Sequence, residues 1–154
     1  MIDKQVLHSA THVVLINSFS RFIPSGKEKR SVTMALKKMM DAINTPKEAA
    51  VLRKFHIKAY KPNSIDIESI QSDLLCLSDS GRLRLKNDLQ LLMNSDSLPI
   101  GLKNNAKVLV INSEQDYILA NQTKEKLAED LINHLEAEPT LINLQEEGLS
   151  LIHI

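Results

Sequence analysis

The sequence predicts an α/β protein in which a small parallel sheet is interrupted by a run of helices. The first observation is the apolar stretch Val108–Ile111, which is followed by a loop that carries Asp116. An amphipathic segment over about 122–136 and a second apolar stretch, Thr140–Leu144, come next, so this part indicates strand, helix, strand. The second observation is that residues 27–93 show helical periodicity and contain no convincing strand. Strands alternating with helices give the α/β class, and the unbroken helices indicate an insertion between two strands of one sheet.

The strands are expected where apolar residues run together. Four consecutive apolar, mostly β-branched residues at Val108–Ile111 predict a strand buried on both faces, as in a parallel sheet covered by helices. The stretch His12–Ile16 is predicted to be a second buried strand, and Thr140–Leu144 a third strand. Residues 1–9 have helical spacing and are expected to be the end of a helix. Such a small sheet is expected to leave an apolar edge exposed.

The inserted helices are expected over 27–43, 45–60, 66–77 and 81–93. In each segment apolar residues recur every three or four positions, which places them on one helix face. Thr45, Pro46 and Glu48 predict a capping box at the start of the second helix.

The domain organisation follows from these elements. Residues 1–26 and 94–154 are expected to form the α/β core, and residues 27–93 are expected to form a helical lid. At 154 residues, the chain has enough length to bury a core.

Composition excludes several classes of function. The chain has 19 basic and 19 acidic residues, 3% aromatic residues and no Trp, so a nucleic acid partner is not expected. Its apolar runs are shorter than the roughly 20 residues that span a bilayer, so no membrane is expected. The start of the sequence lacks the layout of a signal peptide. The single Cys76 rules out an internal disulfide, and a cytoplasmic location is expected.

The stretch Lys107–Asp116 (Lys-Val-Leu-Val-Ile-Asn-Ser-Glu-Gln-Asp), with the helices before it, resembles the carboxyl-terminal half of an α/β-hydrolase. That family commonly shows an apolar strand, a small residue, and an Asp followed by an apolar pair. In this chain Asn112 stands where Gly is usual, and Ile118–Leu119 stand where Val-Pro is usual. The layout is similar to small carboxylesterases, including the pimeloyl-carrier-protein methyl ester esterases of biotin synthesis. From Thr11 to Gly148, the resemblance implies a partial α/β-hydrolase sheet of about three parallel strands, with a four-helix lid inserted between strands.

The resemblance implies that Asp116 is the acid of a Ser-His-Asp site, where it would accept the imidazole N–H. From the residues alone, an alternative is a turn aspartate that binds nearby backbone N–H groups. The family's serine lies in a Gly-x-Ser-x-Gly elbow, and none of the 4 glycines flanks a serine in that pattern. The family's histidine commonly follows a glycine, whereas Gly148 is followed by Leu149, and His153 comes four residues later. We therefore expect the nucleophile and the base to be missing, as in a fragment of a serine carboxylesterase.

Three residues of the loop after the first strand are expected to bind substrate: Ser18, Phe19 and Arg21. A loop at the carboxyl end of a strand faces the cleft in open α/β sheets. Arg21 would pair with a carboxylate or phosphate, with an ordinary surface charge as the alternative. The 5 histidines show no metal-ligand spacing, so neither a metal nor another cofactor is expected.

The expected substrate is a carboxylic ester, either a small molecule or one linked to a carrier protein. Lys27–Arg30 and Lys37–Lys38 form a basic patch on the lid. Such runs are commonly solvated surface, and an acidic carrier protein is the alternative partner. Two other functions stay open: a non-catalytic α/β-hydrolase-like binding domain, and an unrelated α/β regulatory module in which Asp116 is only a turn residue. The sequence leaves the oligomeric state open.

Overall fold

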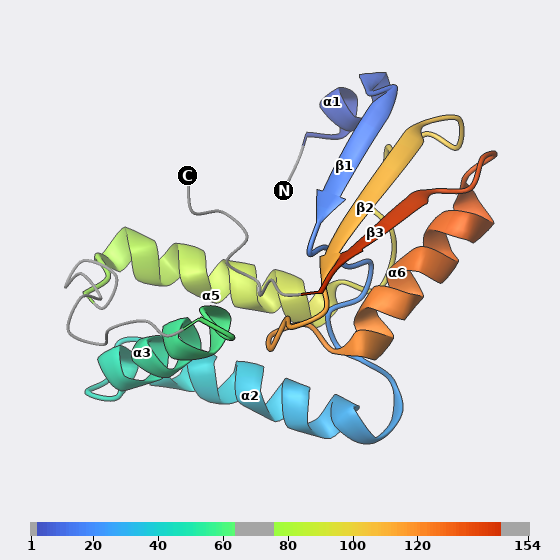
Figure 1. Ribbon diagram of the computed structural model, residues 1–154. Helices are drawn as coiled ribbons and strands as arrows, with labels where there is room; N and C mark the ends of the chain where they lie inside the picture. The colour runs from blue at the N-terminus through green and yellow to red at the C-terminus, as the bar shows by residue number, and fades with distance from the viewer. Residues whose placement is uncertain (1–2, 64–75, 146–154) are drawn as a thin grey trace.

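The computed structural model describes residues 3–63 and 76–145 of the chain. Its elements in chain order are α1 (Lys4–Ser9), β1 (His12–Ile16), the 3-10 helix η1 (Gly26–Glu28), α2 (Lys29–Ala42), α3 (Glu48–Ala59), α5 (Asp79–Asn94), β2 (Lys107–Ser113), α6 (Asn121–His134) and β3 (Thr140–Leu144) (Figure 1). The helix expected over 66–77 falls almost entirely outside the described residues.

The three strands form one parallel sheet in the order β1-β2-β3. Val13 pairs with Val108, and Ile111 pairs with Ile142, so β2 is the central strand. The helix α6 connects β2 to β3, as the strand, helix, strand pattern predicts. The α/β class and the sheet of three parallel strands are therefore confirmed.

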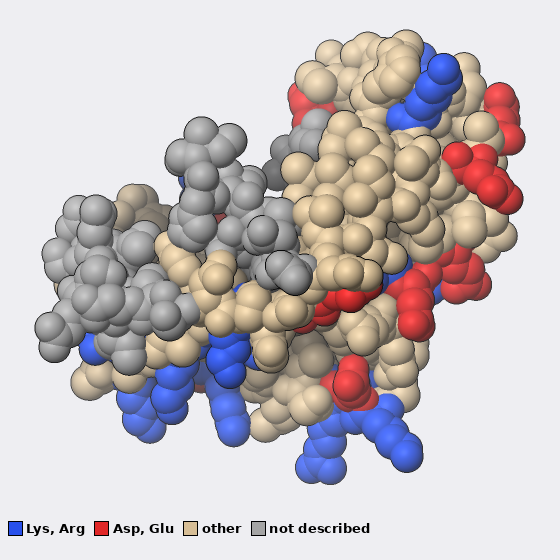
Figure 2. All heavy atoms as spheres, viewed as in Figure 1, with Lys and Arg blue, Asp and Glu red and all other residues tan. Residues whose placement is uncertain are grey.

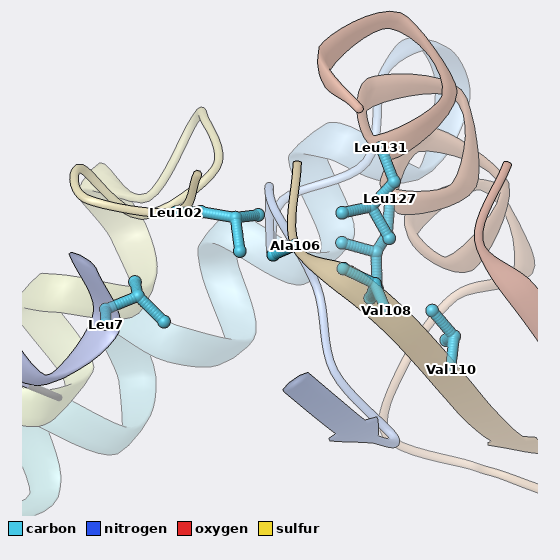
Figure 3. Close-up of a cluster of buried hydrophobic side chains, with 7 residues drawn as sticks. All are labelled: Leu7, Leu102, Ala106, Val108, Val110, Leu127 and Leu131. Atoms are coloured by element: carbon cyan, nitrogen blue, oxygen red, sulfur yellow. The ribbon is translucent and has the colours of Figure 1, made fainter. Parts of the chain in front are cut away.

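Helix α6 covers one face of this sheet. Val108 and Val110 on β2 pack against Leu127 and Leu131 on α6, and all four side chains are at least 95% buried (Figure 3). Residues two apart on a strand share a face, so Val108 and Val110 point to the same helix. The cluster also contains Leu7, Leu102 and Ala106.

The opposite face of the sheet is open among the described residues. Val14, Ile16 and Ile142 are 56%, 47% and 41% exposed, and their register places them on the same face. His12–Ile16 is confirmed as a strand, but the prediction that this strand is buried is wrong on this face. Its residues alternate between half-buried and exposed because α6 covers only one side.

The inserted helices form a layer beyond the carboxyl ends of the strands (Figure 1). Helix α2 packs against α3 and α5. An apolar cluster around Leu36, Ile43 and Leu89 also takes in Phe22 and Ile23 from the loop that follows β1. Three of the four expected lid helices are thus described. None of the helices in residues 3–63 and 76–145 has the length and apolar character needed to cross a membrane.

The capping box predicted at Thr45 is confirmed only in its threonine half, in which Oγ1 of Thr45 accepts a hydrogen bond from the backbone N–H of Lys47 at 3.2 Å. Helix α3 begins at Glu48, and the Glu48 carboxylate accepts a hydrogen bond from the backbone N–H of Asn44 at 2.6 Å instead of reaching Thr45. The same carboxylate also binds Arg82 on α5, whose Nε lies 2.8 Å from Oε2 of Glu48 and whose Nη2 lies 3.0 Å from Oε1. This ion pair joins the second inserted helix to α5 and draws the carboxylate toward it.

Candidate active site

Side-chain hydrogen bonds join the carboxyl ends of β1 and β2. Nδ2 of Asn17 donates to Oγ of Ser113 at 3.1 Å, and the backbone N–H of Ser113 donates to Oδ1 of Asn17 at 2.8 Å. The backbone N–H of Asn17 also donates to the carbonyl of Ile111 at 2.9 Å. Asn17 has φ of 42°, in the left-handed region that asparagine adopts more readily than most residues. The pair anchors the start of the Ser18–Arg21 loop beside the strand that leads to Asp116.

Asp116 lies in the loop between β2 and α6. Its Oδ1 accepts hydrogen bonds from the backbone N–H groups of Ile118 at 2.7 Å and Leu119 at 2.9 Å. Its Oδ2 is buried and has no hydrogen-bond partner among the described residues. One oxygen therefore holds the loop in shape, as expected of a turn aspartate. The other keeps its full capacity to accept a hydrogen bond, and a buried acceptor without a donor is unfavourable by about 1–3 kcal/mol.

The described histidines do not supply that donor. Nδ1 of His12 lies 3.1 Å from the hydroxyl of Thr11, and Nε2 of His134 lies 2.8 Å from the carbonyl oxygen of Leu102. Neither His8 nor His56 is hydrogen-bonded to Asp116 in the described part of the chain. His153 lies outside the described residues.

The loop after β1 is held by contacts of its own. The Phe19 ring packs edge-on against Phe22 with 5.2 Å between centroids. Ser20 is buried, and its hydroxyl donates to Oδ2 of Asp130 on α6 at 2.6 Å. Burial raises the pKa of the Asp130 carboxyl, but hydrogen bonds from Ser20 and Lys126 outweigh this effect and leave the pKa below its ordinary value. Ser20 therefore ties the loop to α6, a role that sequence reasoning missed because the two residues are 110 positions apart.

Three open clefts lie around α6. One of about 570 Å³ lies between α6 and the loop at 21–26, and a second of about 410 Å³ lies beside the 96–102 segment. Arg21 and Lys126 line both of these. A third of about 500 Å³ lies between α6 and the β2 and β3 strand ends. None of the three is lined by Asp116, Ser18 or Phe19. Arg21 therefore shares none of these three clefts with Asp116.

Ser18 is half-buried beside the anchored Asn17, with no hydrogen bond to a histidine among the described residues. In the same part of the chain, no group of three or more His, Cys, Asp or Glu side chains could hold a metal ion. Of the site residues that the sequence predicts, only Asp116 has a geometry that points to chemistry.

These features define an α/β protein whose aspartate follows the central strand of a parallel sheet, with an inserted helical layer beyond the same edge. No family model matches the chain, and no curated protein matches it. Among solved structures, a thioesterase domain from the curacin biosynthetic pathway is similar, with a TM-score of 0.31 and 11% sequence identity. The match covers 90% of this chain and 52% of that one, so the chain spans about half the length of that domain. A similarity this low establishes neither a shared fold nor a shared activity.

Proposed function

We propose that this chain carries the acid of a serine hydrolase that cleaves a carboxylic ester, and that the serine and the histidine come from polypeptide outside these 154 residues. The observation that carries the proposal is that the two oxygens of the Asp116 carboxylate differ in their hydrogen bonding. Oδ1 is bound by two backbone N–H groups, whereas the buried Oδ2 has no partner among the described residues. The acid of a catalytic triad has these two tasks: it is fixed in place and it accepts the N–H of the catalytic imidazole.

The position of Asp116 supports the same role. In open α/β sheets, ligands bind outside the carboxyl ends of the strands, and Asp116 follows the central strand at that edge. The inserted helices lie beyond the same edge (Figure 1), where they would cover an ester. Ser18 and Phe19 stay predicted substrate contacts, because their loop is anchored to β2 through Asn17 and Ser113. Linkage of the ester to a carrier protein and a cytoplasmic location also stay predictions.

The first test uses the chain as it is. The purified polypeptide is expected to hydrolyse a short p-nitrophenyl ester no faster than the uncatalysed background, because an acid alone has no nucleophile to orient. Turnover above background would contradict the proposal that the nucleophile lies elsewhere.

The second test examines the coding DNA on both sides of this sequence. An in-frame Gly-x-Ser-x-Gly upstream and a Gly-His after Glu147 are expected. A reading frame with neither element would favour the alternative, a non-catalytic α/β-hydrolase-like binding domain.

The third test uses the longer protein that carries those elements. Asp116→Asn keeps Oδ1, which accepts from Ile118 and Leu119, but it places an amide where Oδ2 would accept the imidazole N–H. We expect kcat to fall about 10⁴-fold, because the histidine is held in the wrong tautomer. The control is Glu114→Gln, an exposed residue of the same loop, which should leave kcat within about twofold. Equal rates for the two variants would reject Asp116 as the acid.

A further inference from the structure

The basic and acidic residues of this protein are distributed unevenly along the chain, although its net charge is +0. Residues 27–61 contain ten Lys and Arg side chains and three Asp and Glu side chains, a net charge of +7. The whole chain has a net charge of +0, so the remainder carries −7. The overall balance therefore conceals a basic segment that coincides with η1, α2, α3 and their flanks.

All ten basic side chains of this segment are exposed. We call them the basic lid face: Lys27, Lys29, Arg30, Lys37, Lys38, Lys47, Arg53, Lys54, Lys58 and Lys61. Lys and Arg gather along the lower edge of the molecule in Figure 2, over α2 and α3, whereas Asp and Glu gather toward α6. Lys61 also lies over the Tyr117 ring, with Nζ 5.2 Å from the ring centroid, a contact that leaves its charge in place.

The basic lid face is not neutralised within the described part of the chain. The ion pairs there join Arg82 to Glu48 and Asp79, and Lys126 to Glu129 and Asp130. None of them uses a member of the face. Glu48, one of only three acids in the segment, is buried and paired with Arg82 outside it. Among residues 3–63 and 76–145, none of the ten cations is therefore neutralised by an ion pair.

The composition of the face favours an extended anionic surface over a protein partner. Eight of the ten cations are Lys, which is depleted at protein–protein interfaces, and two are Arg, which is enriched there. An ammonium acts as a hydrated point charge, whereas the Arg fork suits specific paired contacts. The 14 residues of α2 alone extend about 21 Å, which exceeds the Debye length of about 8 Å at physiological salt. Charges spread over more than one Debye length cannot all act on one small anion, so they suit a broad anionic surface that each lysine contacts separately.

Two apolar side chains distinguish a lipid surface from a nucleic acid. Met34 on α2 and Phe55 on α3 are 47% and 37% exposed, and each lies on a helix that carries at least three members of the basic lid face. Apolar side chains among lysines are typical of faces that enter the headgroup region of a bilayer. Single-stranded nucleic acid would instead require stacking platforms, and the chain is only 3% aromatic.

We propose that the basic lid face is a docking surface for a membrane rich in anionic phospholipid, to which the protein binds peripherally. The attraction is electrostatic, and Met34 and Phe55 add shallow apolar contact. The inserted helices would then lie against the lipid, with the sheet and α6 directed away from it. This inference concerns where the protein resides and is independent of the role proposed for Asp116.

The experiment is co-sedimentation of the full chain with vesicles of phosphatidylcholine that contain roughly 30% phosphatidylserine, at about 0.1 M salt. We expect binding to these vesicles, little binding to pure phosphatidylcholine, and release near 1 M salt, where the Debye length is about 3 Å. Lys37→Gln with Lys38→Gln should weaken partitioning about 25-fold, because each lysine near an anionic surface contributes a factor of about five. The matched control is Lys103→Gln with Lys107→Gln, which removes the same charge at the amino end of β2 and should change partitioning less than about threefold.

Several outcomes would overturn the proposal. These are no binding to the anionic vesicles at low salt, equal binding to pure phosphatidylcholine, and equal loss in the two double variants. Tighter binding to a DNA duplex than to the vesicles would replace lipid with nucleic acid as the partner. All four exchanged lysines lie outside the buried cores, so matching urea midpoints will establish that a loss of binding is not a loss of folding.

Discussion

The coverage of the sheet on one face predicts two very different responses to truncation of apolar side chains. Leu131 on α6 is fully buried against β2. Leu131→Ala removes three carbon atoms from the core, a transfer term of about 2.4 kcal/mol at about 0.8 kcal/mol per methylene. The cavity left behind brings the expected loss to about 3 kcal/mol, within the usual 2–5 kcal/mol for such changes. The free energy of unfolding of a domain is only about 5–15 kcal/mol, so Leu131→Ala should remove a large fraction of the stability of this protein.

Two matched variants make the test specific. Ile132→Ala alters the next residue of α6, which is 53% exposed, and Val14→Ala alters the open face of β1, where the side chain is 56% exposed. Both should lower the free energy of unfolding by less than about 1 kcal/mol, because most of the removed surface is already in contact with water. Urea denaturation followed by far-ultraviolet circular dichroism measures all three. A loss for Val14→Ala as large as that for Leu131→Ala would refute the conclusion that the second face is open.

Three further predictions concern pH, backbone and loop anchoring. A side-chain hydrogen bond from Arg82, followed by the Asn44 backbone N–H, holds the pKa of the Glu48 carboxyl below its ordinary value of 4.5. Glu48 therefore stabilises the fold above the unfolded-state pKa and loses this contribution as pH falls through its lower folded-state pKa. The difference in urea midpoint between the protein and Glu48→Gln should be large at neutral pH and shrink below about pH 4; a constant difference would contradict this. Gly101→Ala should lower stability by about 1–3 kcal/mol, since φ is 108° and the added Cβ would lie 2.9 Å from the Lys4 carbonyl oxygen; an unchanged thermal midpoint would refute the clash. Ser20→Ala should increase hydrogen exchange in its loop, whereas Ser18→Ala should not; equal exchange in the two variants would reject Ser20 as the anchor.

The sequence predicts the helices and strands of this fold better than it predicts which of their faces are buried and which distant residues they contact. The apolar runs at 12–16, 108–111 and 140–144 identify the three strands, because β-branched clusters between polar segments have few other uses. The same runs cannot indicate which face is covered, since burial depends on where α6 lies. This is why the expected burial of β1 fails on the open face. The glutamate half of the Thr45 capping box is wrong for a similar reason, because Glu48 pairs with Arg82, 34 residues away.

In the candidate site, too, local sequence predicts the position of a residue but not its tertiary contacts. The apolar stretch Val108–Ile111 places Asp116 in the loop after a predicted strand, and the resemblance to α/β-hydrolases implies its role as the acid. Both the turn contacts of Oδ1 and the unused Oδ2 depend on loop geometry that no local pattern reveals. The Asn17–Ser113 pair spans 96 positions, and its only sequence signal is a short polar residue at the end of each strand. Charge alone points to Arg21, and the structure places it in clefts that do not include Asp116.

The parallel pairing of β1 with β2 constrains how the segment between them can be shortened. This segment leaves β1 after Ile16 and enters β2 at Lys107, which pairs with His12 at the other end of the same strand. Its two ends are therefore separated by the length of a strand, about 13–16 Å. A tight turn cannot join them, and a parallel connection needs a dozen or more residues. An engineered minimal version of this protein must keep a crossover of that length even if every inserted helix is removed.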